Sequence, residues 1–137
     1  MFYEQDWLCK QIQMLVRFVA KVVFGKDTSE ATRLVEESTE GTNLLYRDIK
    51  ELLLKGEICQ AENLLFDNLD VNNKSNLAVA VEFYSMLNEL SDEELEKHFF
   101  SRSEIRDGLK NVMQIYGLSF GNKFLEIYFL KGRSKYE

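Results

Sequence analysis

A run of leucines stops at Lys55-Gly56-Glu57 and then starts again, and this break constrains the fold more than any other stretch. Before it, apolar residues up to Leu53 recur every three or four positions, which is the period of an α-helix. The same period resumes at Ile58. Glycine ends helices readily because it adopts the left-handed conformation without strain. Two short amphipathic helices joined at Gly56 must fold back on each other, because neither buries its apolar stripe alone.

The rest of the chain carries the same kind of signal. The sequence contains no proline, so its helices must end at residues such as glycine, asparagine and serine. Residues 77–90 carry two apolar sets at helical spacing, and residues 91–94 (SDEE) and 101–104 (SRSE) match the capping box of a helix start. No alternating strand pattern is found. We therefore predict an all-α fold, with one domain over residues 1–137 and five to six helices packed as antiparallel helical hairpins.

Residues 4–24 form the first predicted helix, and its apolar surface is unusually wide. Its main stripe consists of Leu8, Ile12, Leu15, Val19 and Val22. A second apolar set, Trp7, Met14 and Phe18, lies to one side of that stripe. A surface helix needs an apolar stripe of only about 100°. We therefore expect this helix in the core or in the seam of a homodimer, and its narrow basic face leaves an anionic membrane surface as an alternative.

Charge and cysteine content narrow the classes of function. The net charge of -6 argues against nucleic-acid binding, which needs lysine and arginine to neutralise phosphates. The charge is uneven, because residues 1–26 and 99–137 are net basic and residues 27–98 are strongly acidic. The start of the chain has no signal-peptide pattern. Cys9 and Cys59 are then expected to be buried, reduced thiols in a cytoplasmic protein.

The hairpin over residues 43–69 resembles a tetratricopeptide repeat. The resemblance lies in Gly56, Glu57 and Ile58 at the corner and in Ala61 three residues later. The sequence departs from the repeat pattern at Asp48, Ile49 and Asn68, and it lacks the closing proline. One unit cannot form a solenoid by itself. The likeness implies a tetratricopeptide-like middle that binds a peptide or protein partner, with Asn43, Tyr46 and Lys50 at the ligand-facing positions of its first helix.

Most of the chain also resembles a family of small bacterial proteins known only as a domain of unknown function. The similar stretches are DWLCKQIQMLVRFVAKVVFGK near the start, GEICQAENLLF in the middle and FFSRSEIRDGLKNVMQIYG towards the end. The family brings no activity, cofactor or catalytic residue to carry over. The resemblance therefore implies a small helical protein and nothing about chemistry.

The residues themselves encode little chemistry. His98 is the only histidine, so an HExxH metal motif is absent, and a Cys–His pair would have to join His98 to Cys9 or Cys59. We read His98 as a helix-end residue and Cys59 as a small core residue. No glycine-rich phosphate loop occurs. We expect no catalytic residue, metal or cofactor, and we read the aromatic series Tyr116, Phe120, Phe124 and Tyr128 as core before recognition surface.

The expected function is non-catalytic. We predict a cytoplasmic interaction or scaffold protein whose partner is a protein or peptide, first of all a second copy of the chain bound through residues 7–24. The candidate interaction surface comprises Trp7, Met14, Phe18, Asn43, Tyr46 and Lys50. One alternative is a small-ligand-binding regulator whose pocket between helices is lined by Tyr84, Tyr116 or Phe124. The other is association with a membrane surface through residues 4–24.

Overall fold

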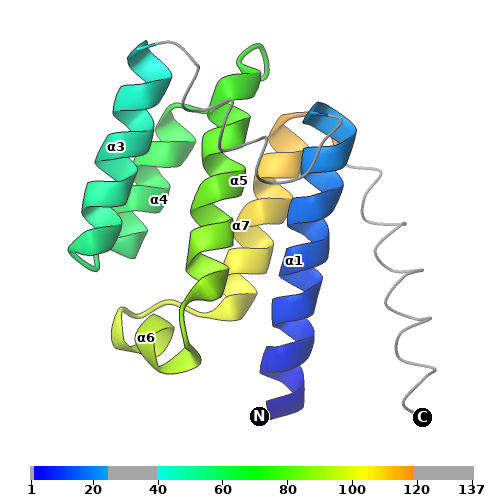
Figure 1. Cartoon of the computed structure of the whole chain (residues 1–137), viewed down its shortest axis with the longest axis vertical. Coiled ribbons are helices and arrows are strands. Elements are labelled where there is room, and N and C mark those ends of the chain that lie inside the picture. The colour runs from blue at the N-terminus through cyan, green and yellow to red at the C-terminus, as the bar shows by residue number, and fades with distance from the viewer. Residues whose placement is uncertain (1, 25–39, 119–137) are drawn as a thin grey trace.

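The computed structural model describes residues 2–24 and 40–118, and within these residues it contains six helices and no strand (Figure 1). The all-α prediction is confirmed. The helices are α1 (Phe2–Phe24), α3 (Glu40–Leu54), α4 (Ile58–Asp67), α5 (Lys74–Glu89), α6 (Asp92–Lys97) and α7 (Arg102–Ile115). Figure 1 shows the hairpin of α3 and α4 on one side of α5, with α1 and α7 on its other side.

Helix α5 lies at the centre, as its two apolar sets predict. It packs against α1, α3 and α7, and no other described helix packs as closely against three neighbours. Its first set, Leu77, Val81, Tyr84 and Leu87, is fully buried. Of the second set, Val79 and Phe83 are buried and Met86 and Leu90 are half-buried. The half-buried pair lies near the C-terminal end of α5, where the neighbouring helices leave part of it uncovered.

Helix α1 packs against α5 and α7 and buries four residues of its main stripe, while the side chain of Val22 lies outside the described part of the chain. Leu8, Ile12, Leu15 and Val19 are all buried, whereas Lys10 and Arg17 on the polar face are exposed. This stripe is therefore buried within a single chain. The expectation that α1 lies in the core is met, and burial of the stripe does not require a second copy. Among the described helices, none has both the length and the apolar content needed to cross a membrane.

The predicted hairpin corner is present. Helices α3 and α4 pack against each other, and Gly56 between them has a φ of +77°. The amide of Glu57 donates to the carbonyl of Leu52, and that of Gly56 donates to Leu53, which together close the end of α3. The hairpin itself follows from these local signals, while the tetratricopeptide likeness stays a prediction from the sequence.

Polar side chains begin three of the helices. The Ser91 hydroxyl accepts a hydrogen bond from the amide of Glu94 at 3.1 Å, and Ser101 accepts one from Glu104 at 3.2 Å. These bonds are the forward halves of the two predicted capping boxes. Asn73 plays the same part for α5, because its side-chain oxygen accepts from the amide of Asn76 at 3.2 Å. The last cap was not anticipated, although asparagine is a preferred residue at that position.

The prediction that both cysteines are buried is wrong. Cys59 is exposed and Cys9 is only half-buried. The buried stripe of α4 runs through Ile58, Ala61 and Leu65. Because consecutive residues are about 100° apart around a helix, Cys59 points away from the stripe that starts at its neighbour. Cys59 is therefore a surface thiol, not a small core residue.

Candidate binding groove

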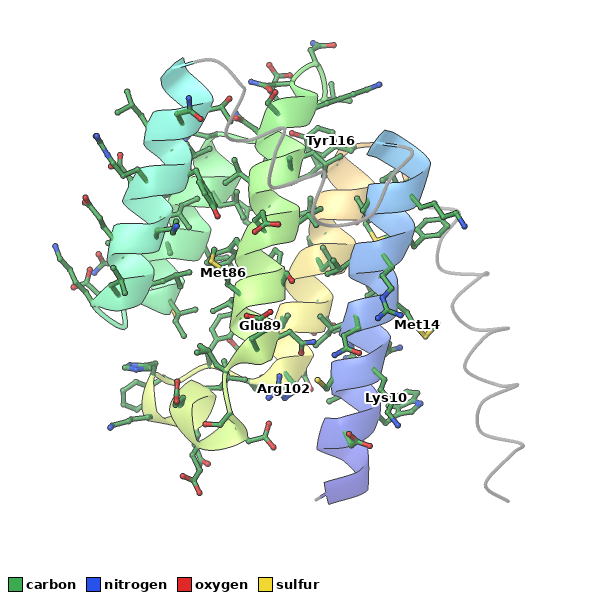
Figure 2. The ribbon with its side chains drawn as sticks, viewed as in Figure 1. Lys10, Met14, Met86, Glu89, Arg102 and Tyr116 are labelled. Atoms are coloured by element: carbon green, nitrogen blue, oxygen red, sulfur yellow. The ribbon has the colours of Figure 1, made fainter. Side chains whose placement is uncertain are left out.

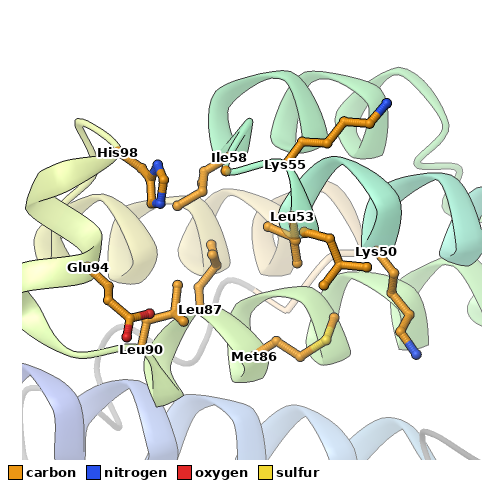
Figure 3. Close-up of a pocket in the computed structure, with 11 residues that line it drawn as sticks. Lys50, Leu53, Lys55, Ile58, Met86, Leu87, Leu90, Glu94 and His98 are labelled. Carbon is orange, nitrogen blue, oxygen red and sulfur yellow. The ribbon is translucent and has the colours of Figure 1, made fainter.

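A groove with a volume of about 470 Å³ lies between the C-terminal end of α3, the corner at Gly56, the second half of α5, and α6 (Figure 3). Its floor is apolar. From the hairpin side Leu53 and Ile58 point into the groove, and from α5 and its end Met86, Leu87 and Leu90 do so. The apolar side chains of α5 continue past the point where α3 ends. The groove therefore arises because α5 carries more apolar surface than the hairpin covers.

Charged and polar side chains edge this floor. Lys50 and Lys55 stand on the hairpin side, and Glu94 and His98 of the α6 region stand on the other (Figure 3). The ammonium of Lys50 lies 5.1 Å from the centre of the Tyr46 ring, a cation–π contact. Neither lysine makes an ion pair with any carboxylate of the described residues.

His98 closes one end of the groove by packing on the hairpin corner. It is the residue that follows α6, as expected of a helix-end residue. A Cβ added to Gly56 would meet the His98 ring, with Nδ1 only 2.7 Å away. Glycine at position 56 therefore meets two needs, since it permits the left-handed turn and leaves room for the imidazole.

Arg102 holds α6 in the position that makes the second wall. Its side chain is buried and donates to Asp92 at 2.7 Å and to both the backbone and side-chain oxygens of Asn88 at 2.9 Å. It also donates to the carbonyl of Leu90. In turn the Asn88 amide donates to the carbonyl of Cys9 in α1 at 3.1 Å. One cation thus satisfies the C-terminal carbonyls of α5 and ties the start of α6 to the bundle.

Two large apolar side chains at this end of the molecule face solvent. Leu54, which lines the groove, is 89% exposed, and so is Phe99, the residue after His98. Phe99 also has a φ of +59°, and within the described residues it is the only non-glycine with positive φ. Its amide donates to Glu96 and that of Phe100 donates to Leu95, the same bonding that ends α3 at Gly56. Phenylalanine here occupies a position that usually needs glycine.

The three positions predicted from the tetratricopeptide likeness are only partly brought to this groove. Lys50 lines it, and Tyr46 lies beneath the Lys50 ammonium and packs against the core. Asn43 is exposed on the same helix but does not line the groove. Sequence reasoning missed Leu54, Met86 and His98 as groove residues. One sequence signal could have indicated the groove: Leu54 is an apolar residue that follows the α3 stripe without belonging to it.

The predicted interaction residues of α1 lie elsewhere. Trp7 is 38% exposed and Met14 and Phe18 are half-buried, and none of them lines the groove. Figure 2 shows Met14 directed away from α5 and α7. Phe18 packs against the buried core, so the second apolar set of α1 is partly covered within the chain.

The tyrosines considered for a ligand pocket make hydrogen bonds within the chain, Tyr84 in the core and Tyr116 in a half-buried position. The buried Tyr84 hydroxyl donates to Glu62 at 2.6 Å, and burial raises the pKa of both groups. The Tyr116 hydroxyl donates to the carbonyl of Asn73 at 3.0 Å and ties the turn before α5 to the end of α7; burial raises its pKa too. Phe120, Phe124 and Tyr128 lie outside the described residues. Across residues 2–24 and 40–118, no three metal-ligating side chains come together.

Comparison with known proteins gives one positive result. No curated protein and no solved structure matches the chain. The model of one protein family, described as "Family of unknown function (DUF6483)", matches residues 2–117. That match covers most of the 137 residues and includes all six helices of the described structure. The chain therefore belongs to the DUF6483 family of unknown function.

Proposed function

We propose that this protein is a non-catalytic interaction module that holds an apolar segment of a partner protein in the groove between α3, α5 and α6. One observation carries the proposal. An open groove with an apolar floor is lined by Leu54 and His98, and the residue after His98 is Phe99. The side chains of Leu54 and Phe99 are both 89% exposed. Contiguous exposed apolar surface at one place on a soluble domain marks an interaction site more often than isolated exposed residues do.

The shape of the site favours a polypeptide over a small ligand. Small-molecule sites enclose most of the surface of their ligand. Here Lys50, Leu54, Lys55 and Glu94, which line the groove, are all exposed, so a small molecule bound there keeps much of its surface in water. Tyr84, expected in a ligand pocket, is instead hydrogen-bonded in the core. The small-ligand alternative therefore finds less support than a protein partner. A cytoplasmic location, expected from the sequence, remains part of the proposal.

Site-specific photo-cross-linking in cells of the native host tests the proposal. A benzophenone amino acid replaces Leu54 in the full chain, and a matched variant carries it at Val71, which is 57% exposed in the turn between α4 and α5. We expect a discrete protein adduct from position 54 and none from position 71. Absence of an adduct at position 54, or the same adducts at both positions, contradicts the proposal.

Self-association through α1 is a second proposal, favoured by the partial exposure of Trp7, Met14 and Phe18. Because the main stripe of α1 is buried within one chain, less apolar surface is left for a dimer than the sequence suggests. For the same reason, attachment of α1 to a membrane surface is less well supported. Sedimentation at micromolar concentration is the test. We expect a dimer that the double variant Trp7→Ser, Phe18→Ser converts to monomer, and a strictly monomeric wild type contradicts it.

A further inference from the structure

We propose that the occupant of the groove is an amphipathic helix of a partner protein, with acidic residues on the flank that faces Lys50 and Lys55. The inference rests on the proposed function and specifies the chemistry of the partner. It combines the apolar floor, the charges on the two walls and the conformation of Phe99.

The occupant is a helix because the groove offers its backbone little. An extended peptide binds well when a sheet edge supplies main-chain donors and acceptors. Most of the residues that line this groove belong to helices, whose backbone groups are bonded within each helix, and it has no strand edge. A bound segment must therefore satisfy its own backbone, as a helix does. Leu53, Met86 and Leu90 then receive apolar side chains spaced three or four residues apart on one face of that helix.

The lysines determine the charge and orientation of the helix. The chain has a net charge of -6, yet neither Lys50 nor Lys55 forms an ion pair with a carboxylate of residues 2–24 or 40–118. Glu94 stands across the groove on the α6 side. Aspartate or glutamate on the flank towards α3 pairs with the lysines, whereas the same residues on the opposite flank meet Glu94. The two walls therefore select acidic residues on one side only, and complementary charge of this kind gives specificity and faster association.

Phe99 supplies independent support for an anchor beside the groove. A left-handed conformation strains a non-glycine residue, because its Cβ crowds the carbonyl oxygen that follows. The ring gains almost nothing from burial in return, since it is 89% exposed. Comparable helix ends in this chain use glycine at Gly56 and Gly117. Backbone strain that brings no packing within the chain is concentrated at ligand clamps, and exposed aromatics are common anchors of interfaces.

Selection from a phage-displayed library of random 16-residue peptides tests the chemistry without presupposing a partner. The full chain is the bait. Peptides that also bind the variant Leu54→Glu are discarded, because they bind outside the groove. Because Leu54 is 89% exposed, this variant is expected to fold. We expect enriched peptides with apolar residues at helical spacing and aspartate or glutamate along one flank. A selection that enriches nothing, or peptides without acidic residues, overturns the inference.

The enriched peptides are then titrated against charge-reversed proteins. The double variant Lys50→Glu, Lys55→Glu is expected to bind at least about tenfold more weakly, which corresponds to about 1.4 kcal/mol. The control is Lys10→Glu, Lys21→Glu, which makes the same change of net charge on the exposed face of α1 and should bind as the wild type does. Equal weakening by both double variants overturns the inference, because the effect is then one of overall charge.

The cross-linking and peptide-selection results distinguish a failure of this inference from a failure of the proposed function. A protein adduct at position 54, together with enriched peptides that lack acidic residues, overturns the acidic helix and leaves the interaction module standing. No adduct at position 54 overturns both. If sedimentation shows a dimer that Leu54→Glu alone converts to monomer, the occupant is a second copy of this chain, and the acidic partner helix is wrong.

Discussion

At the residue scale, the contact between Glu62 and Tyr84 shows how tightly the interior is fitted. The Tyr84 hydroxyl reaches Glu62 across the space that a side chain on Gly108 of α7 would fill. Burial raises the pKa of Glu62 above its usual 4.5, the hydrogen bond from Tyr84 opposes that rise, and the negative charge of Glu104 adds to it. The net direction is upward, so folding favours the protonated carboxyl group.

This direction gives a pH dependence of stability. A folded-state pKa above the unfolded value means that the contribution of Glu62 is complete below about 4.5 and is lost as pH rises through the raised pKa. We expect the wild type to lose stability relative to Glu62→Gln as the pH rises above about 4.5, because the amide cannot ionise. Urea unfolding of both proteins across this range measures it, and two parallel curves contradict the assignment.

A second residue-scale prediction concerns the two left-handed glycines. Gly56 and Gly117 have φ values of +77° and +78°, but only Gly56 has a side chain, His98, in the space that a Cβ would occupy. Gly117→Ala should therefore cost about 1 kcal/mol for backbone strain, and Gly56→Ala should cost about 1–3 kcal/mol more for crowding. Urea unfolding measures the difference. It should shrink when His98 is also replaced by alanine, and a difference that persists rules out the contact as its cause.

At the element scale, the position of α6 depends on one buried cation. Arg102 at the start of α7 bonds to Asp92, Asn88 and Leu90, which belong to the start of α6, the end of α5 and the link between them. The ion pair with Asp92 is half exposed and worth little by itself. The larger effect comes from the carbonyls of Asn88 and Leu90, which are left without this donor when Arg102 is removed.

We therefore expect Arg102→Met to destabilise the protein by about 2–4 kcal/mol, because truncation leaves buried acceptors unsatisfied. Arg106 is the matched control on the same helix, because among the described residues its ion pair is with its exposed neighbour Asp107. Arg106→Met should cost less than about 1 kcal/mol. Thermal and urea unfolding compare the two variants. Similar losses from both show that the buried network does not carry the stability assigned to it.

The sequence predicted those elements whose signals are local. Gly56 and Gly117 end their helices, Ser91 and Ser101 begin theirs, and the apolar stripe of α1 is buried. Each of these features is decided by residues within one or two turns of one another, so periodicity and capping rules suffice.

The groove could not be predicted, because it depends on contacts between elements. Its second wall is placed by Arg102, whose acceptors lie 10 to 14 residues earlier in the chain and leave no periodic signal. The pair Phe99-Phe100 shows the same limit, since Phe100 is buried and Phe99 is exposed. Two adjacent identical residues contain no sign of which one faces the core. Only the path of the chain after α6 decides it.

At the scale of the whole molecule, the six described helices divide into a core and a presenting end. Helices α1, α4, α5 and α7 bury the main stripes, while α3, the corner at Gly56 and α6 frame the groove. Leu54 lines the groove, and Phe99 follows the lining residue His98 in the chain. A chain built only for stability has no reason to keep an exposed phenylalanine at a strained position. We therefore predict that replacing Phe99 changes stability and partner binding in opposite directions.

Phe99→Gly, measured for both properties, tests that claim most directly. Relief of the left-handed strain, reduced by the greater freedom of glycine in the unfolded chain, should raise the free energy of unfolding by about 0.5–1 kcal/mol. The yield of the cross-linked partner at position 54 should fall about tenfold, as expected for the loss of an anchor worth about 1.4 kcal/mol. A variant that is more stable and still captures its partner at the wild-type yield contradicts the central claim.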